Sequence, residues 1–145
     1  ARVGPRDGPA IEARPVELAA LTSGVVDRFR SSAADRGLLM TARGPVEIRG
    51  DATRLDRAVS NLVDNALRHG AGDVVVDVQA VQDGAVLTVT DEGAGFPTPD
   101  TLRPAGNGLG LTIVREIARA HGGTVEVQRV DGRTCVRMVL ASPRM

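Results

Sequence analysis

Lysine is absent from this chain, and all 18 of its positively charged side chains are arginines. A Walker A phosphate loop and a eukaryotic-type protein kinase each need a lysine on the nucleotide phosphates. A Schiff-base enzyme needs a lysine amine as its nucleophile. The sequence therefore excludes all three classes of protein.

Aromatic residues are almost as scarce, since Phe29 and Phe96 are the only two among 145 residues. Stacking platforms for single-stranded nucleic acid are therefore missing. The acidic and basic side chains balance to a formal net charge of zero, which offers no attraction for a polyanion. We expect no nucleic-acid partner.

Cys135 is the single cysteine, so no internal disulfide can form, and we expect a reducing compartment. Because it lies in a β-like run, it is predicted to be a small buried hydrophobe rather than a reactive thiol. No apolar stretch approaches the roughly 18 residues that span a bilayer, and no signal peptide is evident. The length fits one domain.

Residues 1–14 are rich in Arg, Gly and Pro, and we expect a flexible tail or linker before a domain over residues 15–145. Asp51 and Gly70 are natural caps of a helix. Helical periodicity predicts two further helices, at 19–36 and 111–121. β-rich runs predict strands at 15–18, 46–49, 74–81, 86–90, 124–130 and 134–140.

The order of these elements predicts the class of fold. Helices separate the early strands, whereas the later strands pair locally as hairpins around 82–85 and Asp131-Gly132. A mixed α+β layer structure follows from this arrangement.

Two primary amides stand on one face of the helix between Asp51 and Gly70. At 100° per residue Asn61, Asn65 and Arg68 share a line. Asn is a poor helix former, so two stacked amides need a reason. Mg²⁺ coordination through the amide oxygen is one, and capping of a neighbouring loop is another. The opposite face is apolar and carries Leu55, Val59, Leu62, Val63, Ala66 and Leu67.

Two glycine clusters bracket a stretch of about 20 residues without periodicity, a length that is typical of a functional loop. The first, 91–95, leaves the end of a strand, and the second, 106–110, enters a helix. Glycines before a helix suit a phosphate, because the helix N-terminus offers free N–H groups and a positive dipole end. Each cluster alone is weak, since Asp before Gly is ordinary turn chemistry and Gly-x-Gly-x-Gly is not the dinucleotide fingerprint.

The order of the three motifs resembles the Bergerat-type ATP-binding domain of sensor histidine kinases, whose superfamily includes gyrase B, the Hsp90 chaperones and the MutL repair proteins. Residues 61–66 are similar to its N box, 91–96 to its G1 box and 106–111 to its G2 box. The likeness covers about residues 15–141, with His121-Gly122-Gly123 before a strand. It implies a two-layer α/β sandwich with a mixed, mostly antiparallel sheet covered on one face by three helices.

The resemblance implies Mg²⁺ and ATP as cofactors and assigns roles along the helix. Asn65 would give its side-chain oxygen to Mg²⁺, Asn61 would support the metal or the phosphates, and Arg68 would reach the phosphates. His69 would lie near the adenine or ribose, although a histidine that favours the helix dipole is an equal alternative.

The glycine boxes carry the remaining implied nucleotide contacts. Asp91 would select adenine, because a carboxylate only accepts hydrogen bonds and the adenine N6 donates one. Gly93 and Gly95 would let the base lie against the backbone. Thr134 matches a position near that aspartate, and a Thr facing solvent or sheet is equally expected. The G2 box would wrap the triphosphate with Gly106, Asn107, Gly108, Leu109, Gly110 and Leu111.

Asn61 is also a departure that discriminates between branches. ATP-hydrolysing relatives carry Glu there as general base, and the anti-sigma-factor serine kinases also tend to carry Glu. Asn cannot take a proton, which favours the histidine kinases over both. The phosphoryl group would pass to a histidine, and neither His69 nor His121 lies in the family's His-Glu-x-x-Arg-Thr-Pro-Leu context.

We therefore hypothesise the cytoplasmic C-terminal catalytic fragment of a membrane-anchored, homodimeric sensor kinase. Its phosphoacceptor histidine would lie on a separate helical hairpin domain, with a response regulator as the indirect partner. The Phe-rich F box is absent, and the short, proline-stiffened segment 97–105 predicts a different lid closure. The alternatives are a non-catalytic nucleotide-binding regulatory module, a serine kinase of the anti-sigma-factor type, and an α+β interaction domain without nucleotide.

Overall fold

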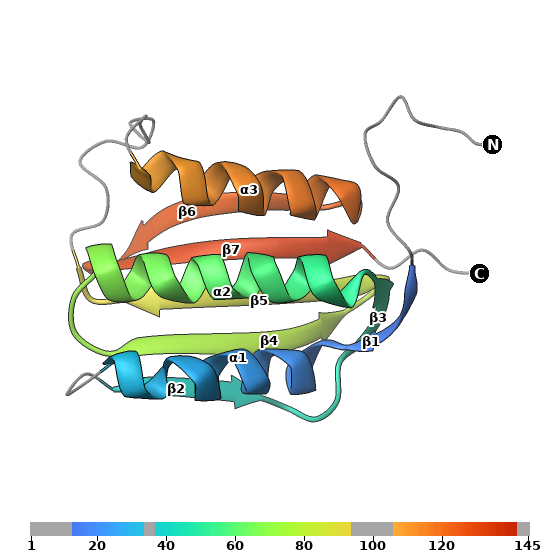
Figure 1. Cartoon of the computed structure of the whole chain (residues 1–145), viewed down its shortest axis with the longest axis horizontal. Coiled ribbons are helices and arrows are strands. Elements are labelled where there is room, and N and C mark those ends of the chain that lie inside the picture. The colour runs from blue at the N-terminus through green and yellow to red at the C-terminus, as the bar shows by residue number, and fades with distance from the viewer. Residues whose placement is uncertain (1–12, 34–36, 94–105, 142–145) are drawn as a thin grey trace.

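The computed structural model describes residues 13–33, 37–93 and 106–141, with the side chains of 106–110 left out. Within these ranges three helices lie on one face of a five-stranded sheet (Figure 1). The helices are α1 (Leu18–Ala33), α2 (Ala52–His69) and α3 (Gly106–Ala120). The strands are β1 (Arg14–Glu17), β2 (Leu38–Ala42), β3 (Glu47–Gly50), β4 (Val74–Val81), β5 (Gly84–Asp91), β6 (Thr124–Val130) and β7 (Arg133–Ala141).

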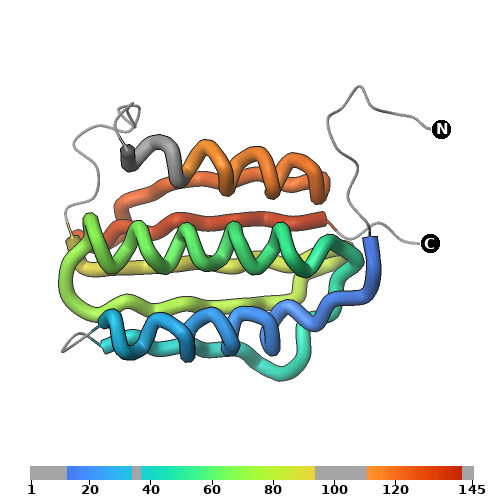
Figure 2. The backbone as a smooth tube through the Cα atoms, viewed as in Figure 1, coloured from blue at the N-terminus to red at the C-terminus, as the bar shows by residue number. Residues whose placement is uncertain are grey.

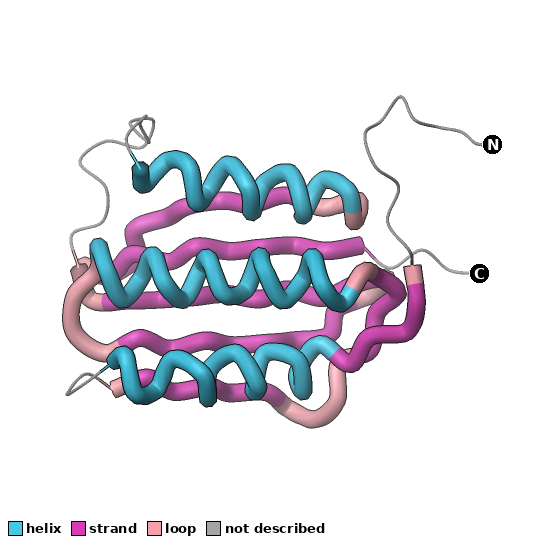
Figure 3. The backbone as a smooth tube through the Cα atoms, in the orientation of Figure 1, coloured by secondary structure: helices cyan, strands magenta, loops and turns pink. Residues whose placement is uncertain are grey.

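The large sheet has the strand order β2-β4-β5-β7-β6. Only β2 and β4 run parallel, with Leu38 opposite Val74, and the other neighbours are antiparallel. A separate two-stranded ribbon joins β1 to β3. This is the predicted sandwich, with a mixed and mostly antiparallel sheet behind three helices (Figure 3).

Helix α2 occupies the centre of the helical layer and begins and ends where its capping residues predict. The Asp51 carboxylate accepts a hydrogen bond from the backbone N–H of Arg54 at 3.2 Å, which satisfies a free donor of the first turn. At the other end the Gly70 N–H donates to the Ala66 carbonyl at 3.0 Å. Its apolar face is buried under the sheet, so this helix is fixed along its whole length.

Helices α2 and α3 lie side by side and run in opposite directions (Figure 2). The C-terminal end of α2 is therefore near the N-terminal end of α3, which begins at Gly106 (Figure 1). At the far end the buried His121 ring accepts the Asp51 N–H on Nε2 at 3.0 Å, while its Nδ1 bonds the Ile117 carbonyl at 2.8 Å. His121 thus ties the two helices together away from the glycine-rich end.

The face of the sheet opposite the helices carries a polar row across all five strands. Register aligns Thr41, Asp77, Thr88, Arg137 and Glu126 from one edge to the other, and the Thr41 hydroxyl donates to the Asp77 carboxylate. Residues of the inner face, such as Val76 and Met138, are fully buried. The alternation separates an apolar core from a hydrated outer surface.

Three sequence predictions need correction. Strand β2 was not predicted, because a five-residue edge strand in a parallel pair has no local hairpin signal. Helix α3 begins at Gly106 rather than at Leu111, although three of its first five residues are glycines, which have a low helix propensity. Cys135 is only half-buried, because it lies in register between Thr90 and Gln128 on the outer face.

The tail was predicted to end at residue 14, but strand β1 already begins at Arg14. Residues 1–12 lie outside the described part of the chain. Among the described residues, no helix combines the length and the apolar character that crossing a membrane requires.

Candidate functional site

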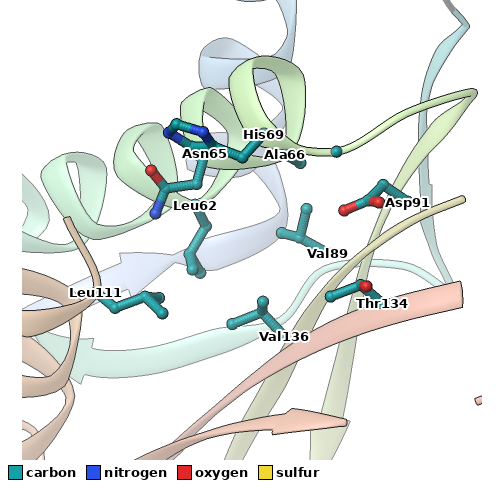
Figure 4. A pocket seen from close by; sticks show the side chains of 10 residues that line it. Leu62, Asn65, Ala66, His69, Val89, Asp91, Leu111, Thr134 and Val136 are labelled. Atoms are coloured by element: carbon teal, nitrogen blue, oxygen red, sulfur yellow. The ribbon is translucent and has the colours of Figure 1, made fainter. Parts of the chain in front are cut away.

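A hollow that is partly open to solvent lies between the C-terminal half of α2, the N-terminal part of α3, the end of β5 and the start of β7 (Figure 4). It is formed at the end of the molecule where the two helices meet the glycine-rich segments. The residues that line it are Leu62, Asn65, Ala66, His69, Gly70, Val89, Asp91, Leu111, Thr134 and Val136.

The lining divides into an apolar interior and a polar periphery. The interior is made by Leu62, Val89, Leu111 and Val136, which come from four different elements (Figure 4). Asn65 and His69 project from α2, whereas Asp91 and Thr134 lie at the other side of the hollow. A flat, apolar ring with a polar edge is the kind of ligand that such a lining accommodates.

Asn65 is half-buried, and the nitrogen of its side-chain amide has no protein partner. Its Nδ2 is one of two buried side-chain nitrogen or oxygen atoms without a hydrogen bond in the described part of the chain. An unpaired buried polar atom destabilises the fold by about 1–3 kcal/mol. Because Asn65 also lines the hollow, this atom marks a place where a polar ligand would be favoured.

Asp91 is 6% exposed and is held in a fixed orientation. Its Oδ1 accepts the Gly93 N–H at 2.6 Å. No described residue donates to Oδ2, which leaves that oxygen available to a ligand. The end of α2 packs closely against the carboxylate, and a Cβ at Gly70 would lie 2.4 Å from the Asp91 Cγ. Glycine is therefore required at this helix terminus for Asp91 to sit in the hollow.

The Gly93 carbonyl is held by donors from two strands. The Thr134 hydroxyl on β7 donates to it at 3.2 Å, and Arg129 Nη1 on β6 donates at 3.1 Å. Thr134 is 4% exposed, so the alternative of a solvent-facing threonine is wrong. The sequence did not single out Arg129, because an exposed arginine on a strand has the pattern of an ordinary solvated position.

Two predicted phosphate-side residues do not line the hollow in this structure. Arg68 Nε bonds both carboxylate oxygens of Asp64, at 3.0 and 2.9 Å, and its side chain is 68% exposed. Asn61 is half-buried one turn before Asn65. His69 is exposed and lies at the rim, while Leu111 is buried and lies in the wall.

The glycine boxes are described only in part. Gly93 is buried beside Asp91, whereas Gly95 lies outside the described residues together with the lid. Helix α3 begins with five residues of the second glycine cluster, of which only the backbone is described: Gly106, Asn107, Gly108, Leu109 and Gly110.

Comparison with known proteins assigns the family. Residues 50–144, which include α2, the hollow and α3, match the family described as histidine kinase-, DNA gyrase B- and HSP90-like ATPases. The chain belongs to this family. The match covers more than half of the sequence and contains all three of the motifs that carried the resemblance.

Relatives within the family are sensor kinases. Sensor protein IrlS of Burkholderia pseudomallei is 35% identical over an alignment of 131 positions, which covers 79% of this chain and 28% of IrlS. Sensor histidine kinase component HK1 of Mycobacterium tuberculosis is 34% identical over an alignment of 134 positions, which covers 82% of this chain and 78% of HK1. The chain thus spans under a third of the length of IrlS.

Solved structures agree with the ATPase fold. The mycobacterial sensor histidine kinase MprB superimposes with a TM-score of 0.76 at 29% identity, over 92% of this chain and 100% of that one. The resemblance to the ATP-binding domain of sensor histidine kinases is confirmed by sequence and by structure.

Proposed function

We propose that this ATPase-family domain binds Mg²⁺-ATP and presents the γ-phosphoryl group to a histidine on a separate helical hairpin domain of the same sensor kinase. The observation that carries the proposal is the hollow itself, where the side-chain amide of Asn65 and the buried carboxylate of Asp91 line the same space. One group suits the metal and phosphate side of a nucleotide, and the other suits the base.

The base would enter the apolar interior with its amino edge toward Asp91. Oδ2 accepts no hydrogen bond from the described residues, and a carboxylate can only accept, so a donor such as the adenine N6 amine completes it. A guanine would bring a carbonyl oxygen to the same place and leave two acceptors facing each other. The site would therefore prefer adenine.

Mg²⁺ fits the residues at the α2 wall. The described residues contain no cluster of three or more His, Cys, Asp or Glu side chains that would hold a metal alone. Mg²⁺ usually takes only one or two protein ligands and completes its shell with phosphates and water. Asn65 would offer its amide oxygen, with Asn61 one turn away. When bound, the ion would neutralise charge on the phosphates.

The chain's own residues would act by positioning and charge. Arg68 would leave Asp64 and turn to the phosphates, since an exposed pair of this kind stabilises by only about 0.3–0.5 kcal/mol. The N-terminus of α3 would bring its free N–H groups to the phosphates. Asn61 supplies no base for water, which favours transfer to an imidazole nitrogen over hydrolysis.

Replacement of Asn65 tests this function. Mg²⁺-ATP should raise the melting temperature of the wild-type chain, and Asn65→Ala should remove most of that rise. Gln79→Ala is the matched control, because Gln79 is an exposed amide on β4. A rise that is equal in Asn65→Ala, or the lack of any rise in the wild type, would contradict the proposal.

An experiment on the full-length protein distinguishes a catalytic domain from a non-catalytic regulatory module. Asn65→Ala should abolish incorporation of label from γ-labelled ATP at histidine, and with it transfer to the response regulator. Signalling that survives the loss of label would instead identify a non-catalytic nucleotide-binding module.

A further inference from the structure

We propose that Arg129 is a positioning residue for adenine recognition, which acts through Gly93 to fix the orientation of the Asp91 carboxylate. The inference rests on the proposed function of the hollow as a nucleotide site. Arg129 itself does not line the hollow, and its guanidinium lies on the neighbouring strand β6.

A continuous set of hydrogen bonds connects the guanidinium to the carboxylate. Arg129 Nη1 donates to the Gly93 carbonyl at 3.1 Å, and the Gly93 N–H donates to Asp91 Oδ1 at 2.6 Å. Gly93 is therefore held at both of its backbone polar groups. Rotation of the carboxylate would break the bond to Oδ1, so the direction of Oδ2 depends on where Gly93 is held.

Thr134 completes the anchor and explains why an arginine is suited to this position. Thr134 lies directly opposite Arg129 in the β6–β7 register. Its hydroxyl donates to the Gly93 carbonyl at 3.2 Å and accepts from Arg129 Nη1 at 3.4 Å. The Arg129 Nη1 therefore donates to two oxygens, the Thr134 hydroxyl and the Gly93 carbonyl. The Gly93 carbonyl accepts from two donors, one for each of its lone pairs.

The other side of the turn is also anchored. The Glu92 N–H donates to the Ala71 carbonyl at 2.8 Å, which joins the turn to the segment that follows α2. The turn after β5 is thus fixed on one side by the α2–β4 connection and on the other by Arg129 and Thr134. Since Gly93 is buried, loss of a donor would not be repaired simply by water.

Nucleotide discrimination measures this role directly. The affinities of the chain for Mg²⁺-ATP and for Mg²⁺-inosine triphosphate, which has a carbonyl in place of the 6-amino group, are compared by calorimetry. Arg129→Met removes the donors and keeps an apolar stem. It should weaken ATP binding about three- to tenfold, the worth of one hydrogen bond, and leave inosine triphosphate affinity unchanged.

Three further variants complete the experiment. Arg133→Met is the matched control, because Arg133 is an exposed arginine of the same hairpin with no bond to Gly93. Arg129→Lys keeps a donor and should restore part of the preference for ATP. Thr134→Val removes the second donor to the Gly93 carbonyl. It should also lower the ratio of the affinity for Mg²⁺-ATP to the affinity for Mg²⁺-inosine triphosphate.

The results separate this inference from the function on which it rests. A preference for ATP that narrows in Arg129→Met and Thr134→Val but not in Arg133→Met supports it. If the ratio of the ATP affinity to the inosine triphosphate affinity is unchanged in Arg129→Met, or if both affinities fall equally, the inference is wrong, although the proposed nucleotide site is still supported. If the wild type binds neither nucleotide, the proposed function fails and the inference fails with it.

Discussion

Two buried polar atoms without partners stand in contrasting surroundings in the described part of the chain. Asn65 Nδ2 belongs to a residue that lines the hollow, whereas Thr22 Oγ1 belongs to a residue of α1 that is 0% exposed and is not part of that lining. A ligand can satisfy the first. The second has no such compensation and is a local weakness of the core.

Removal of the Thr22 hydroxyl should therefore stabilise the fold. Thr22→Val replaces the oxygen by a methyl group of similar shape, and we expect the free energy of unfolding to rise by about 1 kcal/mol. Urea denaturation measures the change. Ser23→Ala, one residue later at an exposed position, should stay within about 0.5 kcal/mol of wild type. A clear loss of stability in Thr22→Val would show that the hydroxyl has a role in the core.

Helix α2 shows how one element serves both the core and the site. Its apolar face is buried against the sheet, and its C-terminal turns supply Asn65 and His69 to the hollow. Since both caps consist of residues next to the helix in sequence, the sequence predicted its bounds correctly. The start of α3 at Gly106 was missed, because the glycines of its first turn have a low helix propensity and so predict a loop.

The N-cap of α2 makes a measurable contribution. Asp51→Ala removes the acceptor of the Arg54 N–H, and we expect a loss of about 1 kcal/mol in the free energy of unfolding. Asp64→Ala on the same helix breaks only the exposed pair with Arg68 and should cost about 0.5 kcal/mol or less. Equal losses of stability in the two variants, measured by denaturation, would show that the N-cap stabilises the fold no more than the exposed ion pair does.

At the scale of the whole molecule, the strand order sets how stability is distributed. β5 is paired on both sides, with β4 and β7, and its inner face is buried. β2 and β6 are the edges of the large sheet. Edge strands open by local fluctuations, while central strands open only with the global unfolding of the domain.

Amide hydrogen exchange should follow this order. We expect the hydrogen-bonded amides of β5 to exchange slowest and those of β6 to exchange faster, because β6 has one partner strand. Mass spectrometry of peptic fragments measures both. Protection of β6 equal to that of β5 would mean that the hairpin opens only with the rest of the sheet.

The sequence by itself determined the features that rest on local physics. The caps of α2, the turn at Asp131-Gly132, where both residues have positive φ, and the amphipathic faces all depend on neighbouring residues. The motifs around Asn65, Asp91 and the glycines likewise predicted the family correctly, because each motif is contiguous in the chain.

Only the tertiary structure decided which of these groups meet. It paired β2 with β4 and placed Arg129 on the Gly93 carbonyl, and it shows in one hollow the residues Asn65, Asp91 and Thr134, which only the family resemblance had put together. Each of these contacts joins residues far apart in the chain, and a distant contact leaves no periodicity in the sequence that would predict it. The steric requirement for glycine at position 70 also follows from a distant contact. Only the tertiary structure shows that a Cβ there would overlap the Asp91 carboxylate.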